Sequence, residues 1–102
     1  MPKLFDIYNG DLDDWFTYEL SKIINKRYLI ILIYSKVWLI RRTVVDRIKK
    51  SYLKYIIFDG TYNVRIGVSN KIDHKYLHKL MNDKNKYVKR AAIKRLKIRK
   101  HK

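Results

Sequence analysis

A period of 24 residues organises most of this chain. The dipeptide Tyr-Leu begins at positions 28, 52 and 76, and an apolar residue followed by a basic one begins at positions 40, 64 and 88. Self-similarity at a fixed spacing predicts a repeat architecture, because one short unit cannot bury its apolar face alone. We therefore predict one repeat domain over residues 1–102, with repeats at 4–27, 28–51, 52–75 and 76–99 and a basic tail at 100–102.

Each repeat carries apolar residues at helical spacing. Val64, Val68 and Ile72 recur every four residues and so line one face of an α-helix. A shorter helix, such as Tyr76 to Met81, comes before it, and a turn rich in Asp, Gly and Asn separates the two. Strand-like alternation is weak, which favours an all-α fold. The equivalent apolar positions of the other repeats are Phe16, Leu20 and Ile24; Ile40, Val44 and Ile48; and Val88, Ala92 and Leu96.

The string L-x-x-L-x-x-D-x-x-x-x-V-[RK] begins at Leu77 and resembles HEAT-like repeats. Its 24-residue period is closest to the leucine-rich repeat variant. The resemblance covers most of the chain and weakens toward the N-terminus, where Ser35 replaces the Asp of repeat 28–51 and Thr17 replaces the Arg of repeat 4–27. It implies a short right-handed α-solenoid of about four two-helix repeats that serves as a binding scaffold. A related HEAT-like group, the alkylpurine DNA glycosylases, lays a basic face along DNA, but no motif here carries that group's catalytic residues.

The charge balance predicts a polyanionic partner. The chain has 25 basic and 9 acidic residues, a formal net charge of +16. Residues 71–102 alone contain thirteen Lys and Arg against Asp73 and Asp83. Such an excess favours nucleic acid or an acidic protein surface, and less strongly an anionic membrane bound through residues 90–102.

The outer side of the longer helix in each repeat is the candidate binding surface. In a stacked array, equivalent positions align into a stripe, and a basic stripe can follow a phosphate backbone. The alternative is a solvated surface without a partner. The candidate residues for nucleic-acid or acidic-partner binding are Arg42, Arg47, Lys49, Lys50, Lys71, Lys75, Arg90, Lys94, Arg95, Lys97, Arg99 and Lys100.

Recurring Asp and Arg positions, such as Asp59 and Arg65, have two interpretations. The basic residues could contact phosphates, or each Asp could cap a helix and pair with the Arg of a neighbouring repeat. We favour the second, because these residues recur in successive repeats whatever else the surface carries.

The aromatic residues also allow two interpretations. Tyr28, Tyr52 and Tyr76 share one repeat position and are predicted to pack between repeats. A less regular group lies near the turns and could stack on bases or anchor a protein, with burial as the default interpretation. These residues are Trp15, Trp38, Tyr62 and Tyr87.

Signatures of catalysis and of metal binding are missing. The chain has no Cys, and its three Gly residues are isolated, which excludes a Gly-rich phosphate loop. His74 and His78 are spaced to share a metal but lack a third ligand nearby. We predict that the protein is not an enzyme and uses no metal, cofactor or small-molecule substrate.

The sequence thus predicts a non-catalytic module that docks on the phosphate backbone of DNA or RNA, largely independently of base sequence. The alternative is a protein-interaction module, for instance a viral protein that inhibits or recruits an acidic or nucleic-acid-binding host complex. The high content of Ile, Lys, Asn and Tyr, typical of an AT-rich genome, is the only hint of a viral source. No signal peptide or membrane-spanning run is evident, so we expect a cytoplasmic location.

Overall fold

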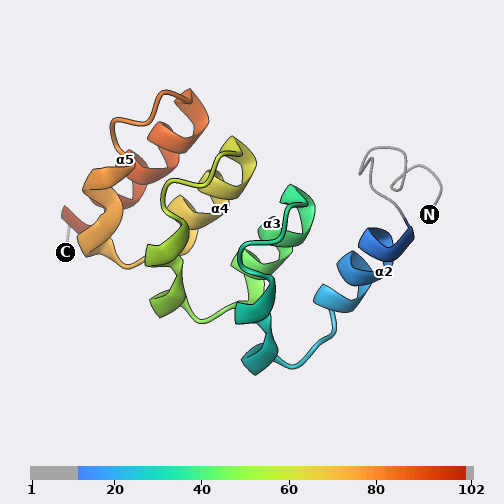
Figure 1. The fold of residues 1–102 in the computed structure, drawn as a ribbon. Helices are drawn as coiled ribbons and strands as arrows, with labels where there is room; N and C mark the ends of the chain where they lie inside the picture. The colour runs from blue at the N-terminus through green and yellow to red at the C-terminus, as the bar shows by residue number, and fades with distance from the viewer. Residues whose placement is uncertain (1–11, 101–102) are drawn as a thin grey trace.

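Residues 12–100 are described by the computed structural model, and within that range the chain is helical without a β-strand (Figure 1). The all-α fold class is confirmed. Four α-helices alternate with three short 3₁₀ helices, labelled η, in this part of the chain. In chain order the elements are α2 (Leu12–Ser21), η1 (Lys26–Leu32), α3 (Trp38–Arg47), η2 (Lys50–Ile56), α4 (Tyr62–Lys71), η3 (His74–Lys79) and α5 (Lys86–Lys100).

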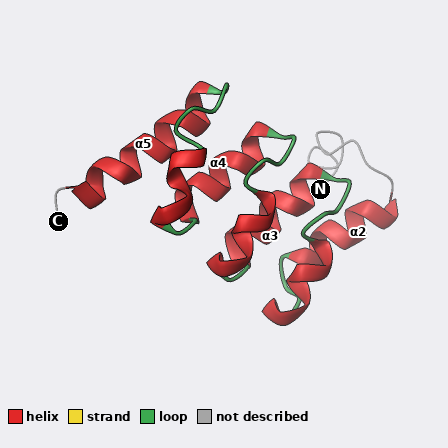
Figure 2. Ribbon diagram, turned by 60° about the vertical axis from the view of Figure 1, so that its left-hand side comes forward, coloured by secondary structure: helices red, strands yellow, loops and turns green. Residues whose placement is uncertain are grey.

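From residue 26 onward the elements themselves recur every 24 residues. The 3₁₀ helices begin at residues 26, 50 and 74, and the α-helices that follow them begin at residues 38, 62 and 86. Each 3₁₀ helix packs on the α-helix that follows it, and each α-helix packs on the next one. The α-helices therefore lie side by side in a row (Figures 1 and 2).

The core forms between successive helices in this row. The predicted apolar positions of α3, α4 and α5 point inward: Val44, Val68 and Ala92 are each 0% exposed. The leucine of each Tyr-Leu pair covers the same core from the 3₁₀ side and is also fully buried. Burial of these side chains from neighbouring repeats is what holds the row together.

Helix α2 departs from the predicted register. Phe16 is 69% exposed and Leu20 is 38% exposed, whereas Tyr18 and Ser21 are buried. The prediction that Phe16 and Leu20 are core residues of repeat 4–27 is therefore wrong. Among the described α-helices, α2 packs mainly on α3, and the side that it buries carries Tyr18 and Ser21.

In the three later repeats the first helix is a 3₁₀ helix that begins two residues before the predicted repeat boundary. In the last repeat it covers His74–Lys79 instead of Tyr76–Met81. Tyr28 and Tyr52 are 43% and 39% exposed, and Tyr76 is half-buried. The prediction that these tyrosines fill the space between repeats is therefore only partly correct, because the neighbouring leucines take that role.

Some predictions fall outside the described structure. They concern residues 4–11 of the first repeat and the last two residues of the basic tail. Arg99 and Lys100 lie in the last turn of α5, but their side chains are not described. Between residues 12 and 100, no helix is long and apolar enough to cross a membrane.

Candidate functional site

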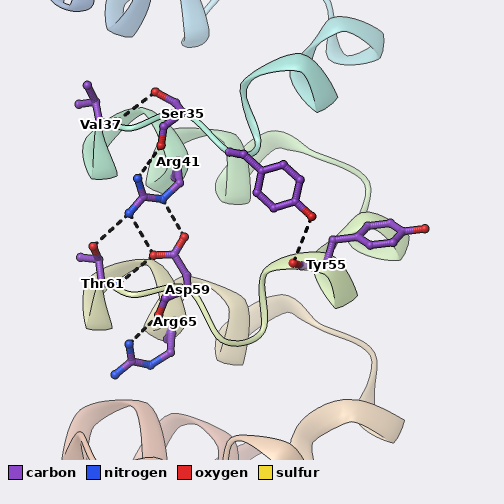
Figure 3. A network of polar contacts seen from close by, with 8 residues as sticks. Ser35, Val37, Arg41, Tyr55, Asp59, Thr61 and Arg65 are labelled. Atoms are coloured by element: carbon purple, nitrogen blue, oxygen red, sulfur yellow. Dashed lines mark hydrogen bonds and ion pairs between the residues drawn. The ribbon is translucent and has the colours of Figure 1, made fainter.

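Two buried ion pairs join consecutive repeats through the recurring Arg and Asp positions. Arg41 donates from Nε to Asp59 Oδ2 at 2.7 Å and from Nη2 to Asp59 Oδ1 at 3.1 Å (Figure 3). Arg65 makes the same pair of bonds to Asp83, at 2.8 and 3.2 Å. The interpretation of these residues as a ladder between repeats is confirmed. These arginines are held inside the protein and are not available to phosphates.

The same arginines also close the turn before their own helix. Arg41 Nη1 donates to the Ser35 carbonyl at 2.6 Å, and Arg65 Nη1 donates to the Asp59 carbonyl at 2.7 Å. Asp59 Oδ1 accepts the Thr61 N–H at 2.9 Å, which shapes the turn rather than capping the helix directly. In the last repeat, Asn85 caps α5 by accepting the Val88 N–H at 3.3 Å.

The Asp83 carboxylate titrates below its usual range. Although partial burial opposes ionisation, hydrogen bonds from Arg65 and the Asn85 N–H, with the Arg65 charge, lower its pKa from 3.8. A lowered pKa contributes stability above the unfolded value, and this contribution is lost as pH falls through the folded value.

We therefore expect the stability gap between the native protein and Asp83→Asn to shrink below about pH 4, since the unfolded carboxyl protonates there. The free energy of urea unfolding, measured at a series of pH values, checks this. Because both proteins share every other carboxylate, the comparison isolates Asp83. A gap that stays constant from neutral to strongly acidic pH would contradict the assignment.

A second ladder uses the basic residues that share the repeat position of Lys71. Arg47 donates to the carbonyls of Ser21 and Ile24 at 2.8 and 2.6 Å. Lys71 donates to the carbonyls of Val45 and Ile48 in the same way. These carbonyls belong to the C-terminal end of the preceding helix, where a cation also compensates the helix dipole.

Arg95 makes the third rung of this second ladder. Its Nη1 donates to the carbonyls of Ser69 and Ile72 at 2.9 and 2.6 Å. Arg47, Lys71 and Arg95 were predicted as binding residues, but the structure commits their charged groups to main-chain carbonyls. They join repeats, and we leave them out of the proposed binding surface.

Arg42 is also held by its neighbours. Its Nη1 lies 3.5 Å from the Asn63 carbonyl, and its Nη2 lies 3.6 Å from Asp46. The guanidinium covers Gly67 so closely that an added Cβ would sit 2.7 Å from Nη1. Gly67 therefore provides the space in which Arg42 lies across α4.

The predicted stripe on the outer side of the α-helices is interrupted. Arg90, Lys94 and Lys97 are exposed on α5, but α4 presents Ile66 and Asn70 at the equivalent positions. Lys49 is exposed just after the end of α3, three residues beyond the Asp46 that pairs with Arg42. The cations on this side are therefore concentrated on α5.

Exposed basic side chains recur on all three 3₁₀ helices. None of the three 3₁₀ helices contains Asp or Glu. Each of them exposes two Lys or Arg side chains. Of these, only Lys50 and Lys75 were predicted. We call this set the 3₁₀ surface; it comprises Lys26, Arg27, Lys50, Lys54, Lys75 and Lys79.

Tyrosines accompany the cations of the 3₁₀ surface. Arg27 lies over the Tyr28 ring, Lys54 over Tyr55, and Lys75 over Tyr76, at 5.1 to 5.4 Å from the ring centres. Each contact joins adjacent residues of one 3₁₀ helix. The recurring basic residue directly before Tyr-Leu at positions 27 and 75 is the sequence signal that could have identified this surface.

A groove of about 550 Å³ lies at the junction of η1, α3 and η2. Its basic lining residues are Lys26, Arg27, Arg47, Lys49, Lys50 and Lys71. Asp46 is the only acidic residue among the described ones that line it, and Ile48 and Tyr52 complete the wall. Burial lowers the pKa of Lys71, and the Lys26 charge adds to this effect while Asp46 opposes it. Positive charge therefore accumulates in the groove beyond what Asp46 compensates.

Within residues 12–100, the ammonium groups of Lys26, Lys49 and Lys50 form no hydrogen bond or ion pair with the protein. The described residues also contain no group of three His, Cys, Asp or Glu side chains suited to hold a metal ion.

Comparisons with protein-family models, with curated proteins and with solved structures found no match to this chain.

Proposed function

We propose that this chain is a short right-handed α-solenoid of four two-helix repeats that binds the phosphate backbone of nucleic acid through its 3₁₀ surface, without catalysis. The resemblance to HEAT-like repeats and to the leucine-rich repeat variant supports the solenoid. So do the recurrence of elements every 24 residues and the two ladders between repeats.

The observation that carries the proposed function is the groove between η1 and η2. Lys26, Lys49 and Lys50 gather there without anionic partners, and the one acid of the groove is shared with Arg42. Clustered like charges destabilise a folded protein unless an anion relieves their repulsion. A phosphate backbone supplies such anions at regular intervals, and the 3₁₀ surface continues from the groove across the next repeats.

Removing charge from the 3₁₀ surface should therefore weaken binding more than removing the same charge elsewhere. The test variant carries Lys26→Gln, Lys50→Gln and Lys54→Gln. The matched control carries Lys86→Gln, Lys89→Gln and Lys94→Gln on α5, where the side chains are equally exposed. Affinity is measured by fluorescence anisotropy with a labelled single-stranded oligonucleotide over a range of salt concentrations.

We expect the test variant to lose at least about tenfold in affinity at low salt. The slope of log affinity against log salt should become shallower by about 2, which is about 0.7 for each lost phosphate contact on a single strand. The α5 control should change both quantities much less. Equal losses in the two variants would show that net charge alone attracts the nucleic acid and would contradict the assigned surface.

Copurification with and without nuclease separates this proposal from a protein-interaction function. Our proposal predicts that the untagged protein carries nucleic acid, with an absorbance ratio that falls after nuclease treatment. One stoichiometric protein that remains bound after nuclease would instead support a module that docks on an acidic partner.

A further inference from the structure

A second hollow, on the other edge of the 3₁₀ surface, is walled by exposed aromatic rings. It has a volume of about 450 Å³ and lies where η1 and η2 end. Tyr34, Tyr55 and Phe58 line it, and they are 69%, 56% and 76% exposed. Lys36 and Lys54 line the same hollow. We call it the aromatic hollow.

One ring of the aromatic hollow, that of Tyr34, is bonded across two repeats. The Tyr34 hydroxyl donates to the Tyr55 carbonyl at 3.4 Å, which ties one repeat to the next. In Figure 3 the Tyr55 side chain extends away from the Arg41–Asp59 ion pair, which closes the floor on the other side. The aromatic hollow is therefore formed by two repeats that are bonded to each other through Tyr34 and through the Arg41–Asp59 ion pair.

A related hollow of about 360 Å³ lies one repeat further along the chain. Phe58 lines both hollows, but the positions of Tyr55 and Phe58 are taken there by Lys79 and Asn82. Lys84 adds a further cation to this second hollow. Moving along the row, the lining thus changes from aromatic to basic, with Phe58 between the two.

Exposed aromatic rings beside basic side chains favour one kind of nucleic acid. Aromatic side chains stack on bases of any sequence, but only where the bases are not already stacked and paired in a duplex. Cations beside the rings supply the phosphate contacts that a single strand also needs. The aromatic hollow has the size of a small-ligand pocket, which is enough for one base and its sugar.

We infer that the protein prefers single-stranded nucleic acid, whose bases stack on Tyr55 and Phe58 while the adjoining phosphates lie against Lys54, Lys79 and Lys84. This inference rests on the proposed function, because it places the bases of the strand whose phosphates the 3₁₀ surface binds. The sequence allowed base stacking or protein anchoring at other aromatic residues, Trp15, Trp38, Tyr62 and Tyr87, with burial as the default interpretation. Tyr62 and Tyr87 are 45% and 51% exposed, so the expected burial is wrong for these two. Trp15 and Trp38 are partly buried against the core.

The test compares three probes of equal length: a single strand, its duplex, and an abasic strand that keeps the phosphates but lacks the bases. We expect the single strand to bind most tightly. Phe58→Leu keeps an apolar side chain but removes the aromatic face, and it should weaken binding of the single strand by about five- to hundredfold. Affinity for the abasic strand should stay unchanged, and Phe58→Trp should restore binding of the single strand.

The outcomes separate the two proposals. A duplex or abasic strand that binds as tightly as the single strand would overturn the inference and leave the proposed function standing. The inference would also be overturned if Phe58→Leu weakened binding of the single strand and of the abasic strand by the same factor. If none of the three probes binds at low salt, the proposed function fails, and the inference fails with it. Because Phe58 is 76% exposed, its substitution should preserve the fold, which circular dichroism checks.

Discussion

Asp83→Ala is expected to lower the free energy of unfolding by about 3–5 kcal/mol, the usual cost of breaking a buried ion pair. The Arg65 side chain is 8% exposed and the Asp83 side chain 11%. Without the carboxylate, the Arg65 guanidinium stays buried with one backbone partner, the Asp59 carbonyl. A domain of this size is stable by about 5–15 kcal/mol in total, so the variant should lie near the limit of folding. Urea unfolding followed by circular dichroism measures the change.

The loss of stability should be large only for a buried ion pair. Glu19→Gln removes the exposed pair with Lys22, whose side chains are 35% and 42% exposed, and it should change stability by less than about 1 kcal/mol. Adding Arg65→Met to Asp83→Ala removes the unpaired charge and should recover part of the loss. An effect of Asp83→Ala as small as that of Glu19→Gln would contradict the ladder.

Arg95→Ala is expected to cost about 2–3 kcal/mol, because two main-chain acceptors at the end of α4 lose their donor. The residues that contribute these carbonyls, Ser69 and Ile72, are each 0% exposed, so water cannot readily replace the guanidinium. Thermal and urea unfolding of the variant measure the loss.

Arg90→Ala is the matched control. Arg90 lies on the same helix and carries the same charge, but it is exposed and lies over the Tyr87 ring, at 6.0 Å from its centre. This variant should change stability by no more than about 0.5 kcal/mol. Equal losses in the two variants would mean that Arg95 acts through its charge alone and does not hold the end of α4.

The period and the residue types made much of the fold predictable from the sequence. The i, i+4, i+8 spacing of Val64, Val68 and Ile72 identified both the helix and its buried face, because burial selects side chains at that spacing. Pairing of Asp and Arg between repeats was also predictable, since complementary charges recurred at equivalent positions of successive repeats. The buried side of α2 was not predictable in this way, because the first repeat follows the pattern only weakly and its apolar spacing indicated the wrong side.

The sequence by itself determined the repeat length, the all-α class, the core of the three later α-helices and the excess of positive charge. Only the tertiary structure decided which cations are free. Arg47, Lys71 and Arg95 reach carbonyls 23 to 26 residues earlier in the chain, whereas Lys26 and Lys50 reach no carbonyl among residues 12–100. The physical reason is that a long basic side chain can either extend into water or lie on a neighbouring helix end. That choice depends on which repeat position faces the end of the preceding helix, and only the packing of adjacent repeats shows this.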